Sequence, residues 1–127
     1  VQAGRLLVES EQAGSEVAEA LRHAMAISEH TEMTVIDVEE LGQGWTAEEA
    51  LAISVACFLT DLEPQEQLLL AVNHSGDSDS TGSILGNLIG ANKGIQAIPM
   101  QWCEDLELVG VIRAVGNELC EGNGPHG

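Results

Sequence analysis

Apolar residues along this chain recur mainly at the three- and four-residue spacing of α-helices. Residues 15–30 read SEVAEALRHAMAISEH, and four apolar side chains there share one helical face: Val17, Leu21, Ala24 and Met25. Residues 45–61, WTAEEALAISVACFLTD, are rich in Ala and Leu without alternation, which favours a buried helix over a strand. Residues 31–44 are less regular, and further helical patterns cover residues 64–74, 80–94 and 106–120. No alternating strand pattern and no internal repeat is visible, so the sequence predicts an all-α fold.

Local signals mark where several of these helices begin and end. Thr46 followed by Glu49 predicts a capping box, in which each side chain bonds the backbone N–H of the other residue. Pro64 suits the first turn of the next helix, and Gly94 can close the one after it. A glycine inside a helix costs about 1 kcal/mol relative to alanine. The glycine stripe in that helix therefore predicts close approach by a neighbouring helix or a ligand at Gly82, Gly86 and Gly90.

The charge of the chain is strongly negative. It contains 21 Asp and Glu residues against 4 Lys and Arg, a formal net charge of −17. Such a charge repels phosphate backbones and anionic headgroups, so we expect neither nucleic acid nor a membrane as partner. The longest apolar run, residues 50–59, is shorter than the roughly 20 residues that span a bilayer. At 127 residues, the chain is long enough for one domain with a hydrophobic core.

The cysteines and the start of the chain suggest where the protein works. Cys57, Cys103 and Cys120 form no CxxC pair, and we expect the first two to pack as small hydrophobic side chains. This usage favours a reducing compartment, and no secretory signal pattern opens the chain. We therefore expect a cytoplasmic protein. The chain starts at Val1 and not at Met, from which we expect a further part upstream or on another polypeptide.

A cluster of oxygen-bearing side chains stands between two of the predicted helices. The stretch NHSGDSDST, residues 73–81, holds Asp77 and Asp79 with Ser80 beside them. Carboxylates and a hydroxyl at one helix N-terminus favour a hard cation such as Mg²⁺, Mn²⁺ or Ca²⁺ over Zn²⁺. The alternative without a ligand is that Asp79 or Ser80 simply caps the following helix.

Two known motifs share part of this spacing and fail elsewhere. A calcium-binding EF-hand loop starting at Asp77 requires a Glu at its twelfth position, where this chain has Leu88. The DSDST segment also looks like the D-x-D-x-T nucleophile motif of haloacid dehalogenases. That chemistry needs a strand before the motif and a lysine and an acidic pair after it. Here an Ala- and Leu-rich helix precedes the motif, and Lys93 is the only lysine.

Over a longer stretch, the sequence resembles the ADP-ribosylglycohydrolase family, the DraG-type and ADP-ribosyl-acceptor hydrolases. The resemblance rests on GQGWTAEEALAISVACFL and LLLAVNHSGDSDSTGSILGNLIGANKGIQAIPMQW, and it is densest from Gly42 to Trp102. Its core is G-D-x-D-[S/T] preceded by Asn73. The family implies an all-α, compact orthogonal bundle of many helices, of which this chain would be the C-terminal half. Residues 1–120 would form this part of a single domain, and residues 121–127 a flexible tail.

The resemblance also implies roles for the acidic residues. Members of the family hydrolyse the bond between ADP-ribose and a protein side chain or small acceptor, using a pair of Mg²⁺ or Mn²⁺ ions. Carried over to this chain, Asp77, Asp79 and Ser80 match metal ligands, and Asp79 would bridge both ions. Four neighbouring residues are candidates for contacting the substrate: Asn73, Ser75, Gly76 and Ser78.

Other motifs of the family have no counterpart in these 127 residues. The family takes further metal ligands and its acid/base carboxylate from an N-terminal half with a Gly-Asp-x-x-Gly segment and a Thr-Asp-Asp run. Here Thr60 and Asp61 are followed by Leu62, and no Asp-Asp pair occurs. The catalytic residues are therefore unknown and expected in that N-terminal half, which we expect as a partner beside an ADP-ribosylated protein or small ADP-ribose conjugate. Three ligands are fewer than the roughly six that Mg²⁺ takes, so we expect the isolated chain to bind Mg²⁺ weakly and to be inactive.

A second hypothesis is a non-catalytic member or fragment that keeps the fold as a structural or ligand-binding protein, since the family also resembles certain lens crystallins. The intact set of Asp77, Asp79 and Ser80 favours the hydrolase. Two further residues have simpler interpretations. We expect His74 to face solvent or to cap a helix, and Trp45 to anchor the buried helix in the core.

Overall fold

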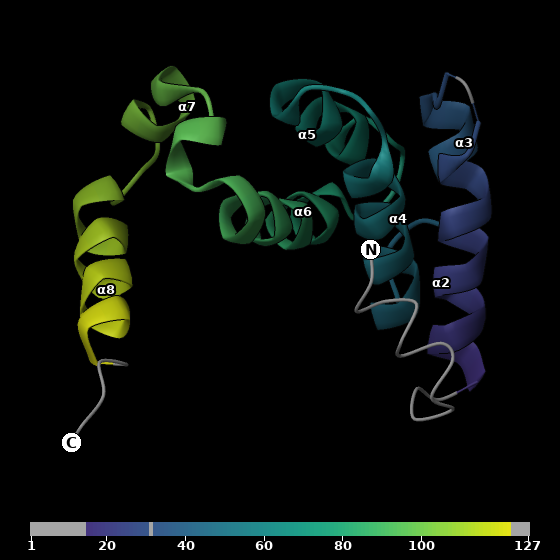
Figure 1. Cartoon of the computed structure of the whole chain (residues 1–127), viewed down its shortest axis with the longest axis horizontal. Helices are drawn as coiled ribbons and strands as arrows, with labels where there is room; N and C mark the ends of the chain where they lie inside the picture. Colours follow the sequence, from purple (N-terminus) through teal and green to yellow (C-terminus); the bar gives the residue numbers. More distant parts are fainter. Residues whose placement is uncertain (1–14, 31, 123–127) are drawn as a thin grey trace. The chain divides into compact units, whose positions relative to one another are not determined.

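The structure is a computed structural model of the 127-residue chain, and it describes residues 15–30 and 32–122. Every regular element in these residues is helical, and no strand occurs among them, which confirms the predicted all-α class. The elements (Figure 1) are α2 (Ser15–Ser28), α3 (Val35–Glu39), α4 (Ala47–Leu59), α5 (Pro64–Val72), α6 (Ser78–Lys93), the 3₁₀-helix η1 (Ile95–Ala97), α7 (Met100–Glu104) and α8 (Val109–Gly122). The chain divides into two compact units, Val1–Ala97 and Ile98–Gly127. None of the described helices combines the length and the apolar character needed to cross a membrane.

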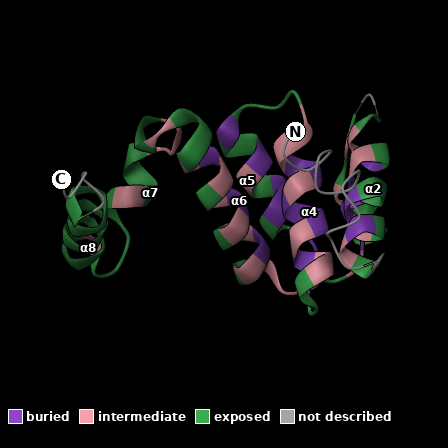
Figure 2. Cartoon of the chain, turned by 60° about the horizontal axis from the view of Figure 1, so that its bottom comes forward, coloured by how far each residue is buried: buried purple, intermediate pink, exposed green. Residues whose placement is uncertain are grey.

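Helix α4 forms the centre of the first unit. Helix α2 packs against it on one side, and α5 and α6 pack on the other (Figure 1). Because it has neighbours on both sides, α4 is apolar around most of its circumference, and it buries Ile53, Ala56 and Cys57 completely. Helix α6 adds Leu85 and Ile89 to the same core. Figure 2 shows buried positions on α2, α4, α5 and α6 alike, so these helices share one hydrophobic core.

Three predicted helix ends are confirmed. Thr46 is the N-cap of α4, and its hydroxyl oxygen accepts a hydrogen bond from the Glu49 N–H at 3.4 Å. Only this half of the predicted capping box forms, because the Glu49 carboxylate bonds backbone N–H groups of the preceding turn instead. Pro64 is the first residue of α5. Gly94, with a φ of +81°, closes α6.

Two features of the first unit differ from the predicted pattern. The less regular residues 31–44 contain the short helix α3, because the Asp37 carboxylate accepts hydrogen bonds from the Thr34 N–H and hydroxyl, both at 2.7 Å. On α2, the buried face is turned relative to the predicted one and consists of Ala18, Leu21, Ala24 and Ile27. The small side chains of α4 allow alanines of α2 to pack closely against it. Which face of α2 is buried therefore depends on the helix that it packs against, and not only on the size of its own side chains.

The second unit contains α7 and α8 in its described part. Helix α8 continues to Gly122, so residues 121 and 122, expected at the start of the tail, are helical. Residues 123–127 lie outside the described residues. Apolar side chains recur along α8 at helical spacing, at Val111, Ile112, Val115 and Leu119.

Candidate metal site

The acidic loop, residues 73–80, comprises the connection between α5 and α6 and the first turn of α6, where the predicted ligands stand. Asp77 is the N-cap of α6. Its carboxylate accepts a hydrogen bond from the Ser80 hydroxyl at 2.9 Å and a longer one from the Ser80 N–H at 3.5 Å. Asp79 lies in the first turn and is exposed. The capping residue is therefore Asp77, and not Asp79 or Ser80 as the alternative without a ligand supposed.

The two aspartates at the start of α6 stand two residues apart in the sequence. The neighbouring Asp79 side chain, and after it the hydrogen bond from the Ser80 hydroxyl, hold the pKa of Asp77 below its ordinary value. Two ionised carboxylates in neighbouring positions repel each other. A divalent cation relieves the same repulsion, since it provides a much larger local charge.

The backbone of the acidic loop is tied to a segment that lies far away in the sequence. The Asp77 N–H donates a hydrogen bond to the Gln43 carbonyl oxygen at 2.7 Å, and the Ser75 N–H donates to the Glu39 carboxylate at 3.2 Å. At Gly76, the two segments approach so closely that a Cβ would overlap the Gln43 carbonyl group. Packing alone therefore requires glycine at position 76, whatever this residue contributes to substrate binding.

Glu49 organises the turn that touches the acidic loop, the glycine turn of residues 42–44. One oxygen of its carboxylate, Oε2, accepts hydrogen bonds from the N–H groups of Gln43 and Gly44, both at 3.1 Å. Gly42 and Gly44 have φ values of +114° and +77°, which glycine adopts without strain. The sequence indicated Glu49 only as a capping residue. The GQG sequence just before the helix was the available signal for a tight turn that needs a nearby acceptor.

One residue of the acidic loop, His74, is buried, so the expectation that it faces solvent was wrong. Its Nε2 lies 2.9 Å from the hydroxyl oxygen of Thr81, which is fully buried, and its Nδ1 accepts a hydrogen bond from the Gly76 N–H at 3.1 Å. No local pattern signals this burial, because His74 stands in a polar stretch. The packing of α5 against α6 encloses the ring.

The other residues singled out from the sequence have simpler surroundings. Asn73 is the C-cap of α5, and its side-chain amide donates to a carbonyl of the last turn of that helix at 2.7 Å. Ser75 is exposed, and Ser78 is the first residue of α6. Trp45 is 69% exposed, and its indole N–H donates to the Gln43 side chain at 3.1 Å. The expectation that Trp45 anchors the core was therefore wrong, because Trp45 stands between the glycine turn and the N-cap Thr46 and not on the buried helix.

The donors of the acidic loop fit part of a site for a hard cation. Asp77, Asp79 and Ser80 are all at least partly accessible, and all of them offer oxygen. In the part of the chain that the structure describes, no three His, Cys, Asp or Glu side chains form a group that could hold a metal ion. Three oxygen donors suit Mg²⁺ or Mn²⁺ in kind but leave much of its coordination to other ligands.

The glycine stripe on α6 is only partly explained by packing. A Cβ at Gly82 would lie 2.8 Å from Cγ1 of Val72, so this glycine allows α5 to approach. At Gly86 and Gly90, an added Cβ would meet no atom of a neighbouring element within 4 Å among residues 15–30 and 32–122. The expected close approach is therefore confirmed at the first glycine alone.

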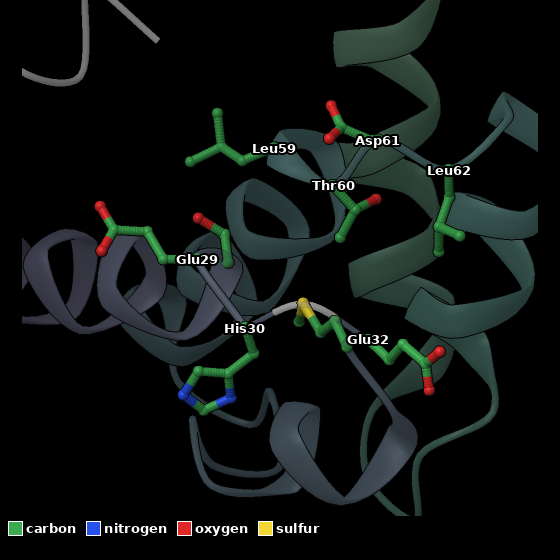
Figure 3. Close-up of a pocket in the computed structure, with 9 residues that line it drawn as sticks. Glu29, His30, Glu32, Leu59, Thr60, Asp61 and Leu62 are labelled. Carbon is green, nitrogen blue, oxygen red and sulfur yellow. The ribbon is translucent and has the colours of Figure 1, made fainter.

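A pocket (Figure 3) lies beside the turn that follows α4, whereas the acidic loop contacts the turn that precedes α4. It has a volume of about 540 Å³ and lies between the end of α2 and the turn after α4, with His30, Asp61 and Leu62 among its lining residues. The glycine turn stands at the start of α4 and the pocket at its end, about 20 Å apart along this 13-residue helix. None of the predicted site residues lines this pocket.

The chain matches the ADP-ribosylglycohydrolase family over residues 1–126, and it therefore belongs to this family, as the sequence resemblance suggested. Its all-α fold is the fold class of the family. No solved structure matches the chain.

Several curated proteins are similar to part of the chain. ADP-ribosylhydrolase ARH3 of Mus musculus is 30% identical over 89 residues, which are 59% of this chain and 24% of that protein. ADP-ribosylhydrolase ARH3 of Homo sapiens is 30% identical over 81 residues, 55% of this chain and 22% of that protein. An uncharacterized protein of Archaeoglobus fulgidus is 34% identical over 91 residues, 72% of this chain and 28% of that protein. The chain thus spans about a quarter of the length of the curated relatives that it matches.

Proposed function

We propose that this chain is part of a hydrolase that removes ADP-ribose from a protein side chain or a small acceptor. In this proposal, Asp77, Asp79 and Ser80 contribute to a binuclear magnesium or manganese centre. Membership of the ADP-ribosylglycohydrolase family supports the reaction, and the name ADP-ribosylhydrolase of the mouse and human relatives supports the substrate class. The proposal depends above all on the start of α6, where the Ser80 hydroxyl donates to the Asp77 carboxylate at 2.9 Å and Asp79 stands in the same turn.

The residues of the acidic loop would hold the ions through their oxygen atoms. When bound, two such ions neutralise the carboxylates, orient ribose hydroxyls and polarise the anomeric carbon or an attacking water. The hydrogen bond from the Asp77 N–H to Gln43 holds the loop backbone, while the side chain of Asp77 remains partly accessible. A backbone held in this way has less freedom to lose when a cation binds, which favours binding.

The remaining ligands and the catalytic carboxylate would come from the N-terminal part of the same enzyme. Three oxygen donors are fewer than the roughly six that Mg²⁺ takes. On this proposal, the isolated chain binds Mg²⁺ weakly and does not release ADP-ribose. The cysteines at positions 57, 103 and 120 are all free, which supports a reducing, cytoplasmic setting.

Native mass spectrometry of the chain together with its complementary polypeptide, in the presence of Mg²⁺, tests the metal assignment. We expect two ions in a complex that contains the complementary polypeptide, and we expect Asp79→Ala to lose them. The matched control is Asp61→Ala, which removes the same charge from an exposed position at the other end of α4. A complex that keeps both ions in Asp79→Ala contradicts the assignment.

Turnover distinguishes a hydrolase from a non-catalytic family member. Release of ADP-ribose from an ADP-ribosylated protein is measured for the chain alone and for the chain with its complementary part. We expect no release by the chain alone and Mg²⁺-dependent release by the complete protein. Release by the chain alone would show that this chain by itself carries a complete active site. Absence of release by a complete, metal-loaded protein would favour a structural or ligand-binding protein.

A further inference from the structure

His74 is the buried member of the acidic loop, with only 6% of its surface exposed. Both of its ring nitrogens are engaged. Nδ1 accepts a hydrogen bond from the Gly76 N–H at 3.1 Å, and Nε2 lies 2.9 Å from Oγ1 of Thr81. The Thr81 hydroxyl in turn donates to the carbonyl oxygen of Ala71 at 2.6 Å. The ring therefore links the acidic loop to the end of α5 and the first turns of α6.

These partners determine where the imidazole proton lies. The backbone N–H of Gly76 can only donate, so Nδ1 must present its lone pair. The Thr81 hydroxyl has one proton, and its shortest hydrogen bond directs that proton to Ala71, so Oγ1 accepts from Nε2. In this arrangement, the ring donates from Nε2 and accepts at Nδ1. Hydrogen bonds then run in one direction from Gly76 through His74 and Thr81 to Ala71, and such chains polarise and strengthen each other.

We propose that His74 is a positioning residue for the metal-binding turn of residues 77–80. The inference rests on the proposed function, because this turn carries the proposed ligands. Gly76 directly precedes the turn and Thr81 directly follows it, so one ring holds both of its ends. Partners of this kind, which contact the ligand-bearing segment and not the ion, typically change metal affinity by roughly 10–100-fold when they are removed.

Conservative variants separate the two contacts of the ring. In His74→Asn, the side-chain oxygen takes the place of Nδ1 and keeps the acceptor for Gly76. In His74→Gln, the side-chain amide takes the place of Nε2 and reaches Thr81 but leaves Gly76 without an acceptor. His74→Ala loses both contacts. The matched control is Ser54→Ala, which removes a buried hydroxyl that is 2.7 Å from the Ala50 carbonyl and 3.1 Å from the Thr81 carbonyl without touching the acidic loop.

NMR spectroscopy of the metal-free chain tests the geometry. In the wild type, the ring nitrogen shifts should identify the neutral tautomer with its proton on Nε2. Amide exchange at Gly76 should become faster in His74→Gln and His74→Ala, and it should stay near the wild-type rate in His74→Asn and Ser54→Ala. A proton found on Nδ1, or unchanged exchange in a folded His74→Ala, would overturn the inference. The tautomer is read from the wild type, so this test does not require any variant to fold.

Titration with Mn²⁺ alone tests the positioning role. Bound Mn²⁺ broadens the amide signals of residues 77–80, and the midpoint of broadening is compared among variants whose thermal melts show a folded chain. We expect the midpoint to rise about tenfold or more in His74→Gln and His74→Ala, and less than about twofold in His74→Asn and Ser54→Ala. Equal midpoints in the wild type and a folded His74→Ala would overturn the positioning role while leaving the metal assignment intact. Absence of broadening in the wild type would instead refute the metal assignment itself, and the positioning role with it.

Discussion

The backbone N–H of Asp77 donates a 2.7 Å hydrogen bond to the carbonyl oxygen of Gln43. This bond joins the residue that caps α6 to the glycine turn that precedes α4. Glu49 holds the glycine turn through two further N–H groups. The position of the Asp77 carboxylate therefore depends on the start of another helix, although the side chain itself stays partly accessible.

Gly76→Ala is expected to force the acidic loop and the glycine turn apart. An added Cβ would lie 2.6 Å from the Gln43 carbonyl carbon and 2.7 Å from its Cα, and backbone atoms cannot rotate away as a flexible side chain can. We expect the free energy of unfolding to fall by about 1–3 kcal/mol. Urea unfolding measures this loss, and Mn²⁺ titration should show weaker binding. A variant as stable as the wild type would show that the two segments do not meet at this distance.

Gly86→Ala is expected to have the opposite effect on stability. The added methyl group meets no atom of a neighbouring element within 4 Å, and alanine favours a helix over glycine by about 1 kcal/mol. The urea midpoint should therefore rise. Gly82→Ala is the comparison within the same helix, since its methyl group would lie 2.8 Å from Cγ1 of Val72 and should offset the gain. A lower midpoint for Gly86→Ala would mean that this face of α6 is covered in solution.

The start of α3 should make stability depend on pH in the acid range. Hydrogen bonds from the Thr34 hydroxyl and N–H, followed by one with His30, lower the pKa of Asp37 from 3.8 to about 2. Because the folded pKa lies below the unfolded one, the ionised carboxylate stabilises the fold above pH of about 4, and this contribution is lost as the pH falls towards about 2. The difference in melting temperature between the wild type and Asp37→Asn should therefore shrink across this range. A difference that does not change with pH would contradict this assignment.

Cys57 should resist alkylation in the folded protein. Burial in the core raises the pKa of its thiol from 9.0 to about 12, and only the thiolate reacts. Iodoacetamide should therefore label the exposed Cys120 of the native chain and leave Cys57 unmodified until urea unfolds it. Peptide mapping by mass spectrometry measures this difference. Labelling of Cys57 as fast as Cys120 would show that the core around α4 opens readily.

The raised pKa of Cys57 also predicts that the protein loses stability at alkaline pH. The folded state holds the Cys57 proton more tightly than the unfolded state, so the stabilising contribution is present below pH of about 9 and is lost as the pH rises towards about 12. Cys57→Ala removes this dependence. Its urea midpoint should therefore decline less steeply with pH than that of the wild type, and equal slopes would contradict the prediction.

Local signals in the sequence were sufficient for much of the fold. Thr46, Pro64 and Gly94 mark helix ends because a cap, a proline or a closing glycine acts on the residues next to it. The same locality explains why α3 was missed. Its signal, Thr34 followed three residues later by Asp37, was present, but five residues are too few to show a hydrophobic period.

The sequence by itself determined the helical class, three of the helix ends and the oxygen-bearing residues of the acidic loop, because each of these depends on neighbours within about one helical turn. Only the tertiary structure decided that Gln43 holds Asp77, that His74 is buried and that Trp45 is exposed. These facts depend on how α5 and α6 pack against α4, and this packing brings together backbone groups that are far apart along the chain. A local sequence pattern does not predict such contacts.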